Sequence, residues 1–209
     1  MGFRTKIKKN IIEFLNRKHL KRQSEKWENL YGKFDGNSYD NFSVKNLANE
    51  SGYYHGELIK WSADLAPKCT LFVGEDTKTA LYLKEKINAQ EVITAGLSEV
   101  DYVWNFEQEP PAIDKKIDLI VSRAIFEHLL NPYKHLRDLT RLVKKQGKII
   151  IHTVMPGFRY HRYPIDALRF YPDWFEEMAD RLNLTIVNKR INENHIFYMY
   201  QKNGSLDKI

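Results

Sequence analysis

The chain has 209 residues, of which 43% are hydrophobic, a length that favours one domain with a sizeable core and excludes a disordered tail protein. Lys and Arg exceed Asp and Glu by +6, but residues 1–22 hold eight bases and one acid, so the rest of the chain is close to neutral. Such a body has no long-range field for nucleic acid, and the single cysteine, Cys69, excludes an intrachain disulfide and a cysteine-rich zinc site.

Residues 3–20 are predicted to form a basic amphipathic helix. Apolar residues recur there at helical spacing, and lysines and arginines fill most positions between them. The apolar residues are Phe3, Ile7, Ile11, Phe14 and Leu15. Such a helix either packs on the domain, which is the commoner arrangement, or lies on an anionic membrane surface.

The segment at 23–60 mixes polar and aromatic residues and is broken up by glycines. We predict that residues 1–60 form an N-terminal extension, in which this segment is a lid or connection over a pocket, and that residues 61–209 form the domain. No apolar run is long enough to span a bilayer, and charges stand where a signal peptide has its apolar part. We therefore expect a cytoplasmic protein, with peripheral contact at the inner membrane face through residues 1–22 as a further option.

From Cys69 onward, short apolar runs alternate with longer mixed segments, as in proteins built of βαβ units. Strands are predicted at 69–74, 91–96, 100–105, 116–122 and 148–154, and helices at 77–86 and near 133–144, the latter closing at Gly147. Ile149, Ile150 and Ile151 indicate a strand buried on both faces of a parallel sheet. A helix at 173–182 and two antiparallel strands, near 185–190 and 195–202, close the chain. The predicted fold is a Rossmann-like, doubly wound α/β sheet of three layers, mostly parallel with an antiparallel edge.

Two blocks of the sequence resemble class I S-adenosylmethionine-dependent methyltransferases. DLIVSRAIFEHLLNP at 118–132, followed by RLVKKQGKIII at 141–151, is similar to that family's fourth and fifth strands, with Asp118 opening the first and Glu127 and His128 following it. Gln146 stands where the family usually has glycine or proline. The block HRYPIDALRFYPDWFEEM at 161–178 resembles a segment of the methyltransferase-11-like branch found in glycan and polysaccharide biosynthesis. The resemblance implies S-adenosylmethionine as cofactor and a small-molecule or glycan-linked acceptor.

The resemblance also implies which residues contact the cofactor: Gly74, Glu75, Asn105, Phe106 and Arg123. The family's glycine-rich loop is VGEDTK here, at 73–78, with Asp76 and Lys78 where the family has glycines. The acidic residue expected after the second strand is missing, unless Glu99 reaches back.

The acceptor side follows the fourth and fifth strands. His128 is the candidate base for a hydroxyl acceptor, because an imidazole titrates near neutral pH; alternatively, it is a structural histidine bonded to a carbonyl. The residues expected to bind the acceptor are His152, His161, Tyr163, Asp166 and Arg169. Arg169 suits a carboxylate or phosphate through its forked donors, but Asp166 and Arg169 also have the spacing of an i,i+3 surface ion pair.

Other chemistries lack their sequence patterns. No HxxxH or HxH spacing joins the histidines, so no metal site is predicted, and the chain has neither a phosphate-binding loop nor a GxSxG elbow. Methyl transfer is therefore the first hypothesis. The second is a catalytically silent methyltransferase-like subunit that has lost the cofactor and binds a partner. Nucleic-acid binding through residues 1–22 is the third, which the near-neutral body does not favour.

Overall fold

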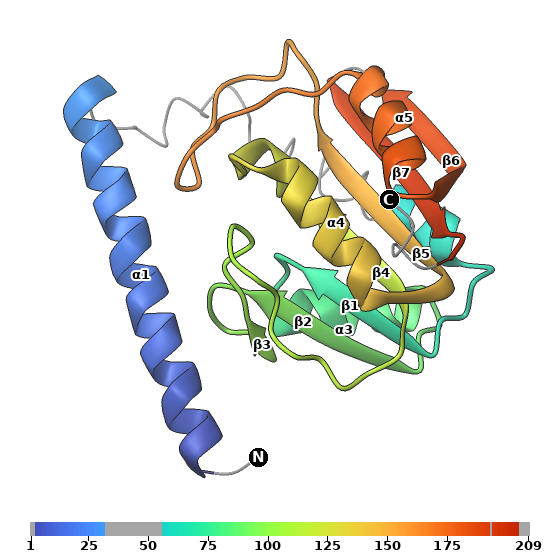
Figure 1. The fold of residues 1–209 in the computed structure, drawn as a ribbon, viewed down its shortest axis with the longest axis horizontal. Coiled ribbons are helices and arrows are strands. Elements are labelled where there is room, and N and C mark those ends of the chain that lie inside the picture. Colours follow the sequence, from blue (N-terminus) through green and yellow to red (C-terminus); the bar gives the residue numbers. More distant parts are fainter. Residues whose placement is uncertain (1–2, 32–55, 193, 205–209) are drawn as a thin grey trace.

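The computed structural model describes residues 3–31, 56–192 and 194–204, and one seven-stranded sheet organises the chain from Cys69 onward (Figure 1). The sheet order is β3-β2-β1-β4-β5-β7-β6, parallel from β3 to β5 and antiparallel at β7 and β6. The strands are β1 (Cys69–Val73), β2 (Glu91–Gly96), β3 (Tyr102–Val103), β4 (Ile117–Arg123), β5 (Val143–Val154), β6 (Leu184–Asn192) and β7 (His195–Lys202). This arrangement confirms the predicted mostly parallel sheet with an antiparallel edge.

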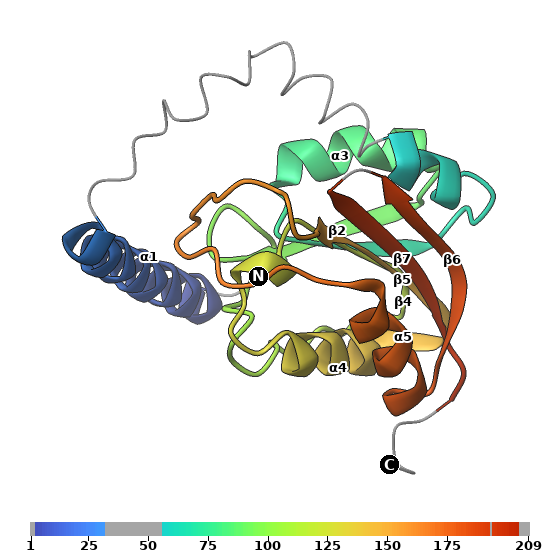
Figure 2. The ribbon, with the colours of Figure 1, turned by 90° about the horizontal axis from the view of Figure 1, so that it is seen from above.

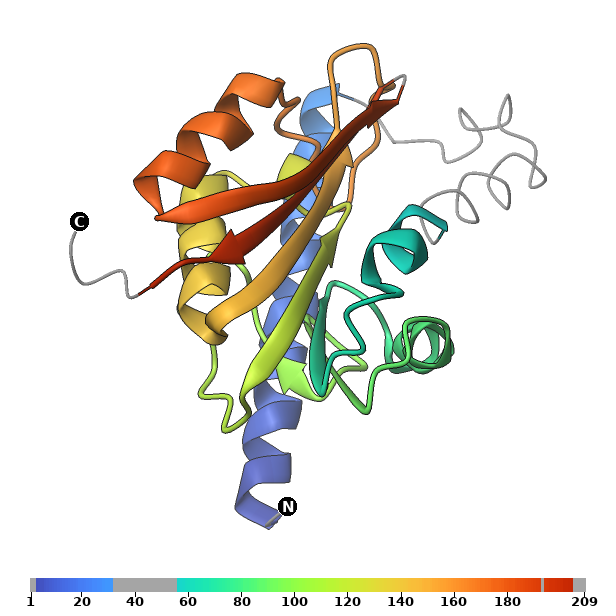
Figure 3. The ribbon, with the colours of Figure 1, turned by 90° about the vertical axis from the view of Figure 1, so that its right-hand side faces the viewer.

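Helices cover both faces of the sheet, which gives the predicted three layers (Figures 2 and 3). The helix α3 (Thr77–Lys86) lies on one face together with helical residues 56–62, and α4 (Pro132–Leu142) and α5 (Pro172–Arg181) lie on the other. Ile149 and Ile151 belong to the core cluster on the α4 and α5 face, and Ile150 belongs to the cluster on the opposite face. The alternation of a strand buried on both sides explains this division.

The predicted C-terminal end of the helix near 133–144 is wrong. α4 ends at Leu142, and the backbone passes directly into β5 at Val143. Gly147 therefore does not terminate a helix. A Cβ at Gly147 would lie 2.6 Å from Cγ2 of Val143 and 2.9 Å from the carbonyl oxygen of Lys144, so the close approach of the chain explains this glycine.

The third strand is much shorter than the predicted 100–105, because only Tyr102 and Val103 pair with β2. Parallel neighbours usually need a crossover of about a dozen residues, commonly a helix, but here residues 97–101 alone join β2 to β3. The Asp101 carboxylate accepts hydrogen bonds from the N–H and hydroxyl of Thr94, at 2.9 and 3.0 Å. The connection from β2 to β3 is therefore a short turn and contains no helix.

The helix α1 (Phe3–Tyr31) is longer than predicted and lies along the β3 edge (Figure 1). The Lys9 ammonium donates to the carbonyl oxygen of Val100. The apolar side chains of α1 at Ile7, Ile11, Phe14 and Leu15 are 44–66% exposed. Among the described residues, no helix is long and apolar enough to cross a bilayer. Most of the segment interpreted as a lid, residues 32–55, lies outside the described residues.

Candidate cofactor and acceptor site

The chain reverses its direction across the sheet between β1 and β4, which are neighbours in the sheet but not in sequence. In open parallel sheets, ligands bind at the carboxyl ends of the strands beside such a reversal. The loops that leave this edge are 74–76, 97–101, 104–116, 124–131 and 155–171. They carry the residues that the sequence singled out.

Gly74 ends β1 in a conformation that favours glycine. Its φ is +84°, and a Cβ there would overlap the side chain of Ile125 from the loop after β4. The Gly74 N–H donates to the carbonyl oxygen of Ala95 at 2.8 Å, while the residue itself is exposed. Gly74 thus presents open backbone at the reversal point, as the close approach of a ligand requires.

The two residues that replace the family's other glycines do not distort this loop. Asp76 has ordinary extended backbone with φ −73°, and its carboxylate accepts from the Thr79 N–H at 2.7 Å, which caps α3. Lys78 is exposed in the first turn of α3. The Thr77 hydroxyl donates to the carbonyl oxygen of Glu99 at 3.2 Å, so the exposed Glu99 lies beside the loop.

Glu75 and Arg123 join the ends of β1 and β4. The Arg123 Nε donates to Oε1 of Glu75 at 2.5 Å, and both side chains are largely buried. The structure therefore brings together two of the predicted cofactor residues, of which Glu75 directly follows Gly74 in the chain.

Asn105 and Phe106, the two predicted cofactor residues after β3, differ in their surroundings. The side-chain oxygen of Asn105 accepts from the Glu107 N–H at 3.1 Å, which forms a tight turn at the carboxyl edge. Phe106 instead packs into the core, with its ring centre 5.0 Å from that of Trp104 and 4.9 Å from that of His135. The expectation that Phe106 contacts the cofactor is therefore not supported by its position.

Glu127 is a buried carboxylate whose role the sequence did not identify. It lies in the short helix η2 (Phe126–His128), and its Oε2 accepts from the Thr153 hydroxyl at 2.7 Å. Its Oε1 has no hydrogen-bond partner among the residues that the structure describes, and it lies 3.8 Å from Nε2 of His161. Its backbone carbonyl accepts from the N–H groups of Ala167 and Leu168, which fastens the loop after β5 to η2.

His128 faces the same loop. Its Nδ1 lies 2.6 Å from the carbonyl oxygen of Ile165, a contact in which Nδ1–H donates and Nε2 keeps the lone pair. Its ring meets that of His161 edge to face, with centres 4.9 Å apart. The carbonyl contact expected of a structural histidine is thus present, and it fixes the tautomer that a base requires.

Asp166 and Arg169 form the predicted i,i+3 pair, but it is buried rather than on the surface. The Asp166 side chain is 1% exposed, and it accepts from the Arg169 guanidinium and from the His161 N–H. Arg169 also donates to the carbonyl oxygens of Phe158 and Arg159. The forked donors predicted to grip an acceptor therefore hold the loop 155–171 in shape.

Charged groups in and beside the loop 155–171 shift the pKa values of Asp166 and His161. Burial alone would raise the pKa of Asp166, but hydrogen bonds from Arg169 and His161 hold it well below its ordinary value. Burial alone would lower the pKa of His161, but the hydrogen bond and charge of Asp166, together with the charge of Glu127, raise it overall.

Two predicted acceptor residues lie away from this group. His152 points to the opposite face from Thr153, its neighbour on β5, and its Nε2 lies 3.3 Å from Nδ1 of His195. Burial and the neighbouring charges of His195 and Arg123 lower the pKa of His152 well below the ordinary value. Tyr163 is 76% exposed on the surface of the loop. His152 is therefore a core residue and does not reach the site.

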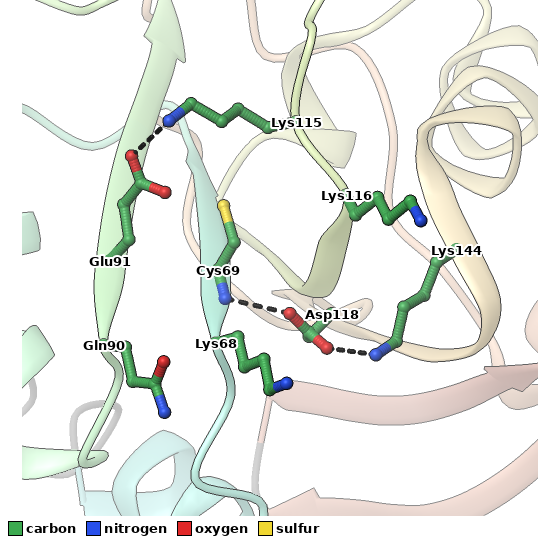
Figure 4. Close-up of a pocket in the computed structure, with 8 residues that line it drawn as sticks. All are labelled: Lys68, Cys69, Gln90, Glu91, Lys115, Lys116, Asp118 and Lys144. Carbon is green, nitrogen blue, oxygen red and sulfur yellow. Dashed lines mark hydrogen bonds and ion pairs between the residues drawn. The ribbon is translucent and has the colours of Figure 1, made fainter.

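A cavity of about 420 Å³ lies at the opposite, amino end of the strands (Figure 4). Its acids are paired: Asp118 bonds Lys144 and the Cys69 N–H, and Glu91 bonds Lys115. Burial raises the pKa of the Cys69 thiol to about 11, so the thiolate that a nucleophile needs is absent at neutral pH. Asp118 therefore ties β4 to β1 and is not part of the candidate site.

Comparison with known proteins gives one family and one fold. A family model described as a methyltransferase domain matches residues 50–199, and none of the curated proteins matches the sequence. The structure resembles an O-methyltransferase family protein from Burkholderia thailandensis, with a TM-score of 0.61 and 9% identity over 76% of this chain and 58% of that one. It also resembles the N-methyltransferase NodS from Bradyrhizobium japonicum WM9, with a TM-score of 0.55 and 12% identity over 74% and 97%. This chain spans less than two thirds of the first of these proteins, and at such identities the likeness shows the fold alone.

Proposed function

This chain belongs to the methyltransferase-domain family, and we propose that it transfers a methyl group from S-adenosylmethionine to a small-molecule or glycan-linked acceptor. The observation that carries the proposal is the open backbone of Gly74 at the reversal point of the sheet. When bound, the cofactor supplies an electrophilic methyl group. The protein then has to align the acceptor and remove its proton.

The half of the edge formed by β1, β2 and β3 fits the cofactor. Gly74 offers backbone without a side chain, and the exposed Glu99 beside the loop offers a carboxylate that can accept from two ribose hydroxyls. Asn105 offers an amide for adenine, because its oxygen is bonded to the Glu107 N–H and its nitrogen is the remaining donor. The ion pair of Glu75 and Arg123 bounds this half toward β4.

The half formed by β4 and β5 suits the acceptor. His128, held by the Ile165 carbonyl, keeps a lone pair on Nε2 and can accept the proton of a hydroxyl acceptor. His161 offers a polar contact on the loop that Asp166 and Arg169 fix. The resemblance of residues 161–178 to the glycan-associated branch supports a glycan-linked acceptor, and the exposed apolar residues of α1 support contact of its basic helix with an anionic membrane surface.

Calorimetric titration with S-adenosylmethionine and S-adenosylhomocysteine tests the proposal. We expect affinity in the micromolar range, weakened about tenfold or more in Gly74→Ala and kept in His128→Ala, because His128 lies on the proposed acceptor half. Gly56→Ala is the matched control, since a Cβ at Gly56 meets nothing within 4 Å. The silent-subunit alternative is motivated by the missing glycines at Asp76 and Lys78, and absence of binding at millimolar ligand would contradict methyl transfer and favour that alternative.

A further inference from the structure

We propose that Glu127, His128 and His161 form a binding site for one divalent transition-metal ion of the Zn²⁺ or Fe²⁺ type. The inference goes beyond the proposed function, since methyl transfer as argued above uses no metal. It also differs from the expectation from sequence, which found no metal-ligand spacing among the histidines.

The first argument is convergence. One ligand atom from each of the three residues lies within 4.8 Å of the other two. Glu127 and His128 are neighbours in η2, and His161 comes from the loop after β5. The backbone bonds from Ala167 and Leu168 to the Glu127 carbonyl hold these two segments together, so the three side chains are positioned before any ion arrives.

The second argument is the orientation of the two imidazoles. Histidines that bind metals commonly donate their other ring N–H to a carbonyl or carboxylate, which fixes the tautomer. His128 Nδ1 lies 2.6 Å from the Ile165 carbonyl oxygen. His161 Nδ1 lies 3.4 Å from Oδ2 of Asp166 and 3.3 Å from the carbonyl oxygen of Arg159. Both rings therefore have Nε2 as the atom available for coordination.

The third argument is the unpartnered oxygen of Glu127. This side chain is fully buried, Thr153 holds only Oε2, and within residues 3–31, 56–192 and 194–204 Oε1 has no hydrogen-bond partner. A buried carboxylate oxygen without a partner is costly. The Nε2 atom of His161, at 3.8 Å, is beyond hydrogen-bond distance. An ion between Glu127 and the two imidazoles would satisfy this oxygen.

The ligand set indicates the class of ion. Two imidazoles and one carboxylate suit Zn²⁺ and Fe²⁺ and leave a coordination position open, whereas Mg²⁺ and Ca²⁺ prefer sites made of oxygen. A hydroxyl acceptor bound at the open position would have a lowered pKa. In the metal-bound protein this effect would replace the proton-accepting role of His128, whose Nε2 lone pair then lies on the ion.

The test uses the full chain, without a polyhistidine tag and after treatment with a chelator. Calorimetry with Zn²⁺ and visible absorption with Co²⁺, both without S-adenosylmethionine, should show one ion per chain. Glu127→Gln, which keeps the shape of the side chain, and His161→Ala should each weaken binding by about 100-fold or more, and Asp166→Asn by about 10- to 100-fold through the orientation of His161. His19→Ala, an exposed histidine on α1, should leave binding unchanged.

Circular dichroism of each variant checks that it folds. If Glu127→Gln does not fold, the metal binding of His161→Ala decides the test. Zn²⁺ should raise the melting temperature of the wild-type chain and not that of a folded ligand variant. Absence of one-to-one binding would overturn the proposal, as would binding that both Glu127→Gln and His161→Ala retain. Because no cofactor is present, neither outcome depends on the proposed methyl transfer.

Discussion

The two halves of the carboxyl edge are built in opposite ways. The loops 74–76 and 97–101, after β1 and β2, are short, and they offer the bare backbone of Gly74 and the exposed Glu99. Around β4 and β5 a long loop is held by buried polar groups, centred on Glu127 and the pair of Asp166 and Arg169. The half proposed for the cofactor thus departs from the family's glycine pattern, while the half proposed for the acceptor has a dense polar network.

The largest expected effect comes from breaking that network. Asp166→Ala should lower the free energy of unfolding by about 3–5 kcal/mol, because it leaves the Arg169 guanidinium without its buried partner. Urea unfolding measures it. The control is Glu177→Ala, which removes an exposed ion pair with Arg181 and should cost at most about 1 kcal/mol. Equal losses in the two variants would contradict the buried network.

The β3 side contains the opposite case, a buried polar group without partners. His135 on α4 lies among the rings of Trp104, Phe106 and Phe126, and neither ring nitrogen has a hydrogen-bond partner among the described residues. His135→Phe should therefore raise the free energy of unfolding by about 1–3 kcal/mol, as measured by urea unfolding at pH 7. A loss of stability would show that the imidazole makes a polar interaction essential to the core.

The same histidine predicts a pH dependence. Burial lowers the pKa of His135 from 6.5 to about 3, so between these values the unfolded chain binds the extra proton. Stability should fall as the pH falls through this window, by up to about 1.4 kcal/mol per pH unit for this group. His135→Phe should have a shallower slope between pH 6.5 and 4 than the wild-type chain, and identical slopes would contradict the assignment.

Gly74→Ala sharpens the comparison at the cofactor half. The left-handed backbone costs an alanine about 1–2 kcal/mol, and its Cβ overlaps Ile125. We expect cofactor affinity to fall by about tenfold or more, with Gly56→Ala unchanged. An unchanged Gly74→Ala would mean that the cofactor does not approach this backbone.

The smallest effect concerns α1, outside both halves. Vesicles with anionic lipids should bind the chain in co-sedimentation, and Ile11→Glu should release it, because Ile11 is among the exposed apolar residues. Leu81→Glu, which changes an exposed apolar residue on α3, is the matched control and should stay bound to the vesicles. Binding that is the same in all three proteins, or absent from all, would exclude α1 as a membrane contact.

Local sequence patterns predicted the helices and strands that have a clear apolar run or an apolar face. The limits of β1, α3 and β2 follow from short apolar runs and a capped amphipathic segment, and Ile149 to Ile151 marked β5. The boundary of α4 was not predictable, because Gly147 suits a tight approach as well as a helix end. The short β3 depends on Asp101 bonding back to Thr94, which no propensity describes.

The candidate site was predicted only in part for a similar reason. Glu75 and Arg123, both predicted to contact the cofactor, form an ion pair, and Gly74 directly precedes Glu75 in the chain. The cluster around Glu127 depends on contacts with Thr153 and His161, remote in sequence, and the sequence signal for it was only the Glu-His pair after the fourth strand. Whether His152 points into the cleft or into the core could not be decided from sequence, because the face of a strand residue depends on register.

Hydrogen exchange of the full chain, with and without S-adenosylhomocysteine, tests most directly that the cofactor binds on the β1–β3 half. The account predicts added protection at residues 73–79 and 97–105, with the loop 155–171 little changed. Protection confined to other segments, or no change at saturating ligand, would contradict it.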